Sequence, residues 1–458
     1  MSELDVIVIG AGAAGLAAGL ELARAGRRVM ILEARDRIGG RIFTLQESRG
    51  GSAAPIELGA EFIHGRPPSL WALIEQAQLP TYELQGSQVW CAGGTLRGPT
   101  DPPDRAYEML EDMTEWIAHR APDRDLTFAD YLIARGITGE SAQPAMNYVE
   151  GFNAADVRRI SVTALARQQR AEDAIQGDRL FRIHGGYASL PEYLADEFVR
   201  AEGQLRIAHP VRRITWQRGA VSVECSDQSG RPAEYAARCL VLTVPLGVLQ
   251  AGTPAFDPRP DALIEQARRL EMGHVVRVVL KFSHAIWQDD AVLAARPELA
   301  ARPDLAARLR SLSFLFTPTE TPATWWTPMP DPTPLLTGWA GGPRAERLYD
   351  ELAAMSDSQA LRRRCITTLA HVLGLPDERL DTSLIECHMH DWRRDPYARG
   401  AYSYVPVGAL DAAAQLATPV EDTLFVAGEH THTADQWGTV HAALESGVRA
   451  ARQVLAAP

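Results

Sequence analysis

The pattern that most limits what this chain can fold into lies close to its N-terminus. An unbroken apolar run at residues 6–9 leads into a Gly-x-Gly-x-x-Gly sequence that begins at Gly10, and a second apolar run follows at residues 29–32. Continuous apolar runs are typical of strands that are buried on both faces of a sheet. The Ala- and Leu-rich stretch between the runs predicts a helix that ends at Gly26. The sequence therefore predicts a strand–helix–strand unit that belongs to a parallel sheet.

The glycines of this unit predict a dinucleotide-binding site. Gly10 allows a tight turn, Gly12 lets the backbone approach a pyrophosphate, and Gly15 lets the helix pack closely on the strand. The N-terminus of the helix supplies N–H groups and positive dipole to the phosphates. Glu33 ends the second run, where a carboxylate accepts hydrogen bonds from ribose hydroxyls. An acidic residue at this place disfavours NADP.

Five further segments share a pattern with one known family. They are residues 33–41, which contain Gly-Gly-Arg, then 57–65, 239–249, 395–404 and 428–441. Together they follow, in order along the whole chain, the conserved segments of the FAD-dependent amine oxidases, and the sequence resembles this family. The likeness is greatest to the branch of polyamine oxidases and lysine-specific histone demethylases, because of residues 395–404 and the Gly-Thr-Val-His at 438–441.

The resemblance implies that the cofactor is FAD. Family members that attach the flavin covalently carry a Cys just before a cavity Tyr, whereas here Ala401 precedes Tyr402, so the FAD is expected to be non-covalent. The residues expected to bind it are Gly10, Gly12, Ala14, Gly15, Glu33, Ala34, Arg35, Gly40, Arg41, Leu58, Gly59, Ala60, Glu61, Val211, Gly428, Glu429, Thr439 and Val440.

The resemblance also implies a substrate cavity in front of the flavin. Two aromatic side chains often enclose the amine there; Tyr402 occupies one position, and Thr439 stands at the other. The further residues expected to bind substrate are His64, Phe152, Asn153, Trp392 and Trp437. For His64 and for each Trp an ordinary structural role is about as well supported by the sequence as a role in the site.

The main departure from the family is at Arg277. Family members usually carry a lysine there, bonded through a water to flavin N5. Lys281 lies on the same strand face but about 13 Å away at about 3.3 Å per residue, so it is not expected to substitute. Arginine cannot release a proton near neutral pH, but it can hold a water and stabilise reduced, anionic flavin. Arg277, Tyr402 and Thr439 are the expected catalytic residues, and a slow reaction with oxygen stays open as a consequence of Arg277.

The length of 458 residues predicts two domains. The fold class expected is α/β, with a Rossmann-type FAD-binding domain interleaved with a substrate-binding domain that has a mixed sheet and helices. The FAD-binding domain is expected to comprise residues 1–65, 201–270 and 401–458. The substrate-binding domain is expected to comprise residues 66–200 and 271–400.

Composition and charge limit the partners and the location. The net charge of −12 argues against nucleic acid, and no apolar run approaches the roughly 18 residues that span a bilayer. The five cysteines are scattered without a CxxC pair, which indicates a reducing compartment, so the chain is expected to be cytoplasmic, and bacterial from its arginine-rich composition. No metal is expected, since His430 belongs to a flavin motif. A monomer and a homodimer are both open.

The reaction that the resemblance implies is oxidation of a polyamine or another primary or secondary amine. Hydride passes to flavin N5, the imine hydrolyses to an aldehyde, and O2 is reduced to H2O2. Three alternatives stay open: an L-amino acid oxidase, for which Arg66 would bind the carboxylate; a flavin desaturase or isomerase acting on non-amines; and an FAD-bound protein that is catalytically weak because of Arg277.

Overall fold

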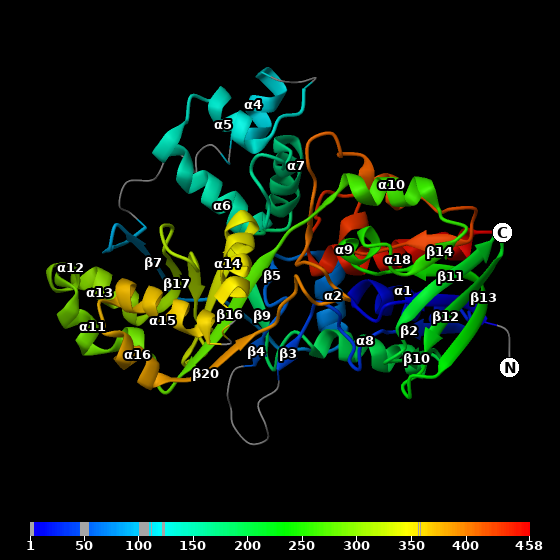
Figure 1. Cartoon of the computed structure of the whole chain (residues 1–458), viewed down its shortest axis with the longest axis horizontal. Helices are drawn as coiled ribbons and strands as arrows, with labels where there is room; N and C mark the ends of the chain where they lie inside the picture. Colours follow the sequence, from blue (N-terminus) through cyan, green and yellow to red (C-terminus); the bar gives the residue numbers. More distant parts are fainter. Residues whose placement is uncertain are drawn as a thin grey trace.

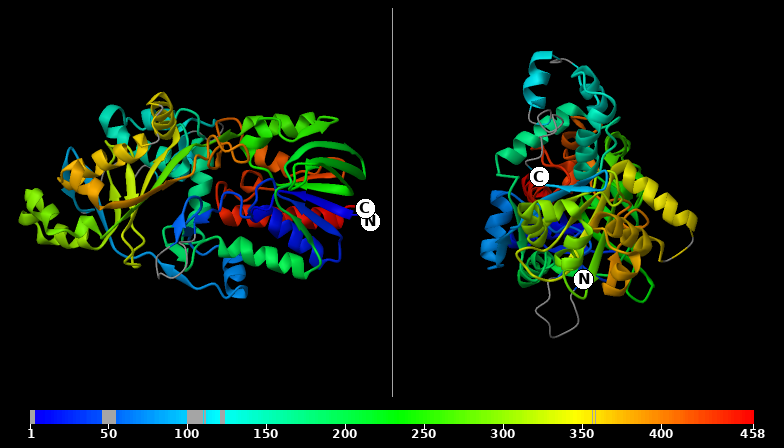
Figure 2. Two further views of the ribbon diagram at one scale, coloured as in Figure 1. Left: turned by 60° about the horizontal axis from the view of Figure 1, so that its bottom comes forward. Right: turned by 90° about the vertical axis from the view of Figure 1, so that its left-hand side faces the viewer.

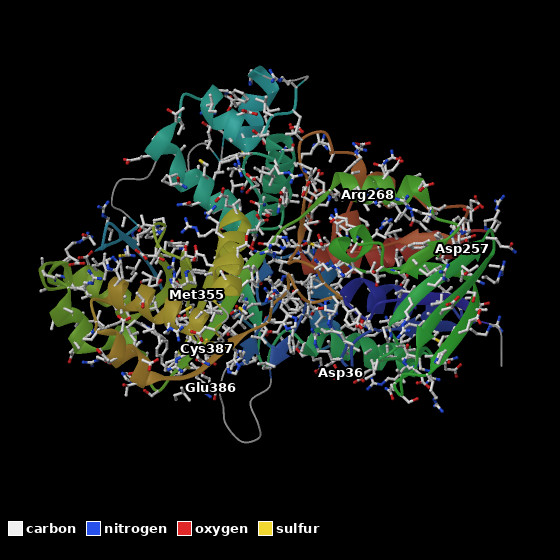
Figure 3. The ribbon with its side chains drawn as sticks, in the orientation of Figure 1. Asp36, Asp257, Arg268, Met355, Glu386 and Cys387 are labelled. Atoms are coloured by element: carbon white, nitrogen blue, oxygen red, sulfur yellow. The ribbon has the colours of Figure 1, made fainter. Side chains whose placement is uncertain are left out.

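The computed structural model describes residues 4–45, 55–99, 110, 112–120, 124–355, 357 and 359–458. The chain forms two halves that lie side by side along the long axis of the molecule, each built on its own large sheet (Figure 1). Both marked termini lie at the outer end of one half. In Figure 3 Asp257 and Arg268 mark this half, and Met355, Glu386 and Cys387 mark the other.

The half that carries the termini is built on an eight-stranded sheet. Its strands, in spatial order, are β10 (Gln204–Arg206), β2 (Val29–Leu32), β1 (Leu4–Ile9), β13 (Pro232–Leu242), β12 (Ala220–Ser226), β11 (Val211–Gln217) and β14 (Ala255–Asp257), with β22 (Leu424–Val426) also paired to β13. The pairs around β1 are parallel, as Val8 faces Ile31 on one side and Val241 on the other. The predicted strand–helix–strand unit is therefore confirmed.

Helices cover both faces of this sheet because each presents an apolar face to it. On one face lie α1 (Ala13–Arg24), α2 (Pro68–Gln76), α8 (Ser189–Arg200) and α18 (Val440–Ala456); on the other lie α9 (Leu246–Gln250), α10 (Asp261–Arg269) and α17 (Ala412–Leu416). The placement of α2 and α8 differs from the predicted boundaries, which assigned residues 66–200 to the substrate domain. Leu70 and Phe198 are buried with α1 in one core, so both helices complete the dinucleotide half.

The other half is built on a seven-stranded mixed sheet. Its order is β20 (Leu384–Met389), β16 (Val275–Phe282), β19 (Leu335–Gly341), β18 (Thr324–Trp326), β17 (Leu312–Phe316), β7 (Ser87–Ala92) and β8 (Thr95–Arg97). The helices of this half are α11 (Asp290–Ala295), α12 (Pro297–Ala301), α13 (Pro303–Arg310), α14 (Gly342–Met355), α15 (Ala360–Leu373) and α16 (Asp377–Ser383). The α/β fold class is confirmed.

Among the described residues, four helices project from the junction of the two halves (Figures 1 and 2). They are α4 (Met113–Arg120), α5 (Phe128–Ala134), α6 (Gln143–Asn153) and α7 (Val162–Asp173), and they share a core of their own around Phe128 and Tyr131. Short strands connect the halves: β3 (Thr44–Leu45) with β4 (Ile56–Glu57), β5 (Ile63–His64) and β6 (Thr81–Glu83) with β9 (Leu180–Ile183), and β15 (Glu271–Met272) with β21 (Ser403–Tyr404). Within the described residues no helix has the length and apolar character needed to cross a membrane.

Candidate active site

A cavity of about 1080 Å³ lies where the two halves meet. It runs from the ends of β1 and β2 to the sheet of the second half, and it takes in residues from all the segments singled out in the sequence. Every residue predicted for the cofactor, for the substrate or for catalysis lines it, with the exception of Gly15. The sequence therefore predicted which segments meet here.

The dinucleotide end of the cavity is made of backbone. Gly12 is the N-cap of α1 and no side chain caps this helix end. A Cβ on Gly40 would lie 3.3 Å from the Cα of Gly12, so the two glycine loops touch each other. Gly15 lies beneath them, where a Cβ would come within 1.9 Å of the carbonyl oxygen of Gly10. Its role is the close packing of helix on strand, which explains why it does not line the cavity.

Glu33 and Arg35 hold the outer part of this end. The carboxylate of Glu33 accepts hydrogen bonds from the amides of Ala11 (2.7 Å) and Arg35 (2.9 Å). The Arg35 guanidinium pairs with Asp395 at 2.8 Å, and Asp395 also contacts His390 Nε2 at 2.7 Å. Burial opposes the charge of Asp395, but the bonds to His390 and Arg35 outweigh it and hold the pKa of this carboxyl below its ordinary value. The segment after β20, which carries His390 and Asp395, therefore fixes the orientation of Arg35 at the cofactor end.

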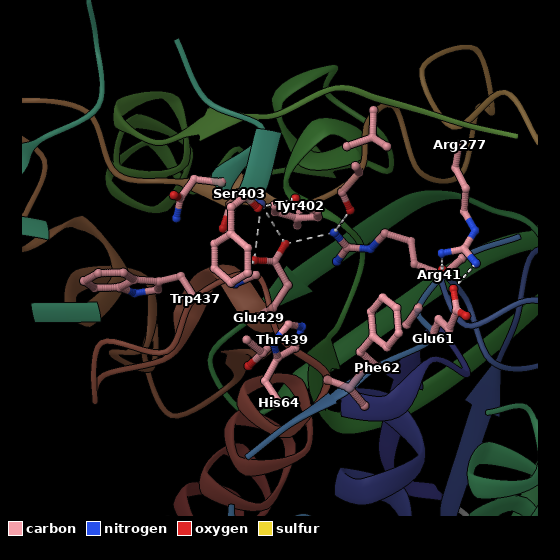
Figure 4. Close-up of a pocket in the computed structure, with 18 of the residues that line it drawn as sticks. Arg41, Glu61, Phe62, His64, Arg277, Tyr402, Ser403, Glu429, Trp437 and Thr439 are labelled. Atoms are coloured by element: carbon pink, nitrogen blue, oxygen red, sulfur yellow. Dashed lines mark hydrogen bonds and ion pairs between the residues drawn. The ribbon is translucent and has the colours of Figure 1, made fainter. Parts of the chain in front are cut away.

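Glu429 connects three loops at the centre of the cavity (Figure 4). Its buried carboxylate accepts from Arg41 Nη1 (2.9 Å), Ser403 Oγ (2.6 Å) and the amide of Gly438 (3.1 Å). Burial would raise the pKa of Glu429, but Arg41 and the other donors keep it below its ordinary value. The Arg41 guanidinium also donates to the carbonyl of Ala401 at 2.7 Å. The predicted flavin motif therefore holds these loops together through the carboxylate of Glu429, whose negative charge is balanced by Arg41.

Arg277 lines the cavity but is fixed by the protein itself. Its Nε donates to the carbonyl of Glu57 at 2.7 Å, its Nη1 to the carbonyl of Gly59 at 3.2 Å, and its Nη2 pairs with the carboxylate of Glu61 (Figure 4). The sequence analysis did not predict this pairing, which joins β16 to the segment after β4. The guanidinium is buried, and its orientation is set by three acceptors.

Glu61 accepts from two arginines at once. Arg182 on β9 pairs with one carboxylate oxygen and Arg277 with the other, while Trp326 Nε1 donates to Glu61 at 3.0 Å. Burial opposes the charge, but the two guanidinium groups outweigh it and hold the pKa of Glu61 below its ordinary value. The cluster of Glu61, Arg182 and Arg277 carries a net charge of about +1 beside the cavity.

Tyr402 holds helix α6 against the cavity. Its hydroxyl donates to the carbonyl oxygen of Phe152 at 2.6 Å, and burial raises its pKa, so it stays a neutral donor. A Cβ on Gly438 would lie 3.1 Å from Tyr402 Cδ2, so the ring contacts that loop. Thr439 is the N-cap of α18 and accepts from the amide of Ala442 at 3.2 Å. Its hydroxyl therefore caps the N-terminus of α18.

Trp392 and Trp437 are mainly packing residues. Trp392 Nε1 donates to the carbonyl of Leu58 at 2.8 Å, and Trp437 Nε1 donates to that of His432 at 2.8 Å. Both side chains are almost fully buried, although each has an edge on the cavity. Their structural roles are thus shown, and contact with substrate stays a prediction.

An aromatic wall at the substrate end was missed by the sequence analysis. It comprises Phe62, Trp90, Phe314, Phe316, Trp326 and Trp339. Neighbouring rings touch, since the ring centroids of Trp90 and Phe316 are 4.8 Å apart and those of Phe62 and Trp326 are 5.4 Å apart. Residues two apart on a strand share a face, so the alternation of Phe314 and Phe316 was the available signal.

His64 and Phe152 form the opposite side of this compartment. Their rings meet edge to face with centroids 5.6 Å apart, and Tyr148 stacks on Phe152 at 5.6 Å. Burial lowers the pKa of His64 to about 4, so the imidazole is neutral at physiological pH. The predicted substrate residues His64, Phe152 and Asn153 are therefore brought together at one end of the cavity.

A family model for flavin containing amine oxidoreductases matches residues 13–455. The chain belongs to this family. Polyamine oxidase 3 of Oryza sativa subsp. japonica is 28% identical, over 98% of this chain and 88% of its own length. Lysine-specific histone demethylase 2 of Homo sapiens is 25% identical, over 99% of this chain and 53% of its own length. The predicted family resemblance is confirmed.

Solved structures of flavin amine oxidases have the same fold. Putrescine oxidase bound to putrescine superposes with a TM-score of 0.78 at 21% identity, covering 99% of both chains. Cyclohexylamine oxidase from Brevibacterium oxydans IH-35A superposes with a TM-score of 0.77 at 22% identity, covering 99% of this chain and 98% of its own.

The residues of this flavin amine oxidase fit a dinucleotide flavin. The contact between the Gly12 and Gly40 loops leaves backbone rather than side chains at the end of α1, as a pyrophosphate requires. Glu33 lies where its carboxylate would accept hydrogen bonds from ribose hydroxyls, and Arg41 is partly exposed to the cavity. These residues would hold the cofactor, and the compartment of aromatic rings would take the substrate.

Proposed function

We propose that this chain oxidises an amine with non-covalently held FAD, giving an imine that hydrolyses to an aldehyde. One observation carries the proposal: a single cavity joins the glycine-built dinucleotide site to a compartment with aromatic walls. When bound, FAD would accept the hydride of an amine C–H bond at N5 and pass the electrons to O2, giving H2O2. The protein supplies orientation and excludes water.

The side chains of the compartment have separate tasks. Tyr402 and Phe152, tied by the 2.6 Å hydrogen bond, hold the amine between apolar faces. His64 stays neutral, so it does not repel a cationic substrate. Arg277 supplies a fixed positive charge and no proton, because arginine stays protonated. Hydride transfer from an amine that binds deprotonated needs no protein base, so the arginine is compatible with the reaction.

An amino acid substrate has less support than an amine. It would need a cation for the carboxylate, and the Arg66 side chain, the residue suggested for this role, stacks on Trp71 at 4.2 Å and does not line the cavity. Arg35, Arg41 and Arg277, which line it, are each paired with a carboxylate, and Arg97, which also lines it, has an exposed side chain on β8. A cytoplasmic location is also part of the proposal, supported by the free cysteines of the structure.

The test is anaerobic mixing of the yellow protein with polyamines, diamines, simple alkyl and aryl amines and L-amino acids. Bleaching of the flavin by amines, followed by recovery in air with formation of H2O2, is the expected result. Bleaching by an amino acid and not by its decarboxylated amine would select the amino acid oxidase. FAD that stays bound and is bleached by none of them would overturn the proposal. Slow recovery of the flavin colour in air would indicate that Arg277 slows the reaction with oxygen.

A further inference from the structure

The last turn of α7 forms one wall of the substrate compartment. Glu172 lies in this turn and lines the same cavity as Tyr402 and His64. The loop that follows is bound to the His64 loop, since the amide of Gly65 donates to the carbonyl of Arg179 at 2.7 Å and the amide of Arg66 to that of Ile175 at 2.6 Å. Glu172 is therefore placed next to the predicted substrate residues, on an element that the sequence analysis did not connect with them.

A row of polar side chains leads from the centre of the cavity to Glu172. Asn153 Nδ2 donates to Gln168 Oε1 at 3.2 Å, and Gln168 Nε2 donates to Glu172 Oε1 at 3.1 Å. Asn153 follows Phe152, whose carbonyl accepts from Tyr402. The hydrogen bond from Gln168 fixes one carboxylate oxygen of Glu172 and leaves the other for a ligand.

The charge of Glu172 distinguishes it from the other glutamates at the cavity. Glu33 lies 3.9 Å from Arg35, Glu429 pairs with Arg41, and Glu61 pairs with two arginines. Within the described part of the chain Glu172 makes no ion pair.

The surroundings of Glu172 favour a cation. Burial raises its pKa to about 7, and the neighbouring Asp173 adds a negative charge. The C-terminus of α7 adds the negative end of a helix dipole. A buried carboxylate without a cation is costly, and an ammonium group of a ligand would compensate it.

We propose that Glu172 binds the second, non-reacting ammonium of a diamine or polyamine, with Gln168 as its positioning residue. This inference rests on the proposed function and specifies its substrate class. The reacting amine would lie between the aromatic faces near Tyr402, and the aliphatic chain would pass Phe152 and His64. Their ring faces suit CH2 groups and, nearer the carboxylate, a cation. A monoamine would leave Glu172 without its partner.

The test compares Glu172→Gln with the wild-type holoenzyme on 1,4-diaminobutane, spermidine and 1-aminobutane. The expected result is a loss of about 30-fold or more in kcat/KM for the two substrates with a remote ammonium, and less than about twofold for 1-aminobutane. Glu150→Gln is the matched control. Burial raises the pKa of Glu150 to about 7 as well, but this residue lies on α6 outside the cavity lining. It should leave all three substrates unchanged.

A binding measurement separates failure of this inference from failure of the proposed function. 1,4-Diaminobutane should raise the Tm of the wild-type holoenzyme more than 1-aminobutane does, and Glu172→Gln should abolish the difference. This readout does not need turnover. Equal losses on the diamine and the monoamine, or a variant that keeps the diamine preference, would overturn the role of Glu172. Absence of bleaching by every amine, with the Tm difference intact, would overturn amine oxidation and leave the ammonium site.

Discussion

The two ends of the cavity differ in the chemical groups that line them. The cofactor end consists of glycine backbone and of carboxylates paired with arginines, as in Glu429 with Arg41. The substrate end consists of aromatic rings and of the carboxylates of Glu172, Asp173 and Asp178, and Glu172 makes no ion pair in the described structure. At the first end the protein balances its own charges, so removal of a partner damages the fold. At the second end the ligand completes the balance, so a change there alters which substrate binds.

The largest effect is expected from Glu61→Gln. It would leave Arg182 and Arg277 buried beside the cavity without a counter-charge, which costs about 3–5 kcal/mol when a buried pair is broken. Urea unfolding of the FAD-loaded variant measures this loss. Glu83→Gln is the control, because the Arg179–Glu83 pair connects the same small sheet but its side chains are 37% and 39% exposed, against 8% and 7% for Arg182 and Glu61. The control should cost about 0–1 kcal/mol.

Equal losses for the buried and the exposed pair would contradict the distinction between the two ends of the cavity. They would mean that water reaches Glu61 and that the arginines do not depend on it. In that case Arg277 would not be fixed by the protein, and a part in catalysis through a held water would gain weight.

A second large effect is expected from Gly15→Ala. The added Cβ would lie 1.9 Å from the carbonyl oxygen of Gly10, and neither backbone can move without shifting β1 or α1. Overpacking of this kind costs about 1–3 kcal/mol, and here it would also displace the loop that receives the pyrophosphate. We expect a lower Tm and weaker retention of FAD on dilution.

Gly19→Ala is the matched control because it lies on the same helix. The nearest atom to its Cβ is Cδ1 of Ile31, the end of a flexible side chain, so it should retain FAD. If Gly15→Ala retained FAD as well as the control does, backbone contact would not be the basis of the cofactor end.

The glycine-built part of the cofactor end was predictable because its elements are local in sequence, unlike the pairing of Arg41 with Glu429. The turn at Gly10 and the carboxylate at Glu33 belong to one strand–helix–strand unit, and their spacing alone fixes their positions. The substrate end brings together side chains from β7, β17, β18, β19, α6 and α7, whose contacts depend on how two sheets pack. The spacing of residues in the sequence does not indicate how the two sheets pack together. The aromatic wall and Glu172 were therefore missed.

The contacts of Arg277 show the same limit of prediction from sequence. Its place at the cavity was predicted from the family pattern, but its pairing with Glu61 was not, because Glu61 lies far from it in sequence. For Thr439, by contrast, the structural role can be predicted from the neighbouring sequence. A Thr at the start of an apolar helical stretch is itself a signal for an N-cap, and the structure shows that use.

The preference for a diamine over a monoamine should depend on pH. Glu172, with its pKa raised to about 7 by burial, is charged above this pH and neutral below it, so it attracts an ammonium only at the higher pH. A diamine keeps both charges in this range, since an alkyl ammonium has a pKa of about 10. The ratio of kcat/KM for 1,4-diaminobutane over 1-aminobutane should therefore rise up to about tenfold from about pH 6 to about pH 8.

Other groups facing Glu172 cannot produce this rise. His64 has a pKa of about 4 and is neutral throughout, and Gln168 does not titrate. Asp173 and Asp178 line the same end and carry the same sign of charge as Glu172. In Glu172→Gln the ratio should be flat with pH. A rise that persists in this variant would show that Glu172 is not the group responsible for the pH dependence.

The smallest effect is expected from Tyr402→Phe. The change removes the 2.6 Å hydrogen bond to the Phe152 carbonyl and keeps the ring, so the cost is about 1 kcal/mol. Tyr349→Phe removes a similar bond, 3.0 Å to the carbonyl of Val275, from a side chain that does not itself line the cavity. Both variants should lose similar stability in urea unfolding. Only Tyr402→Phe should raise KM for amines, because only there does the lost bond free the end of α6 that carries Phe152. An equal KM in the two variants would show that the aromatic rings, and not this hydrogen bond, hold the substrate end in shape.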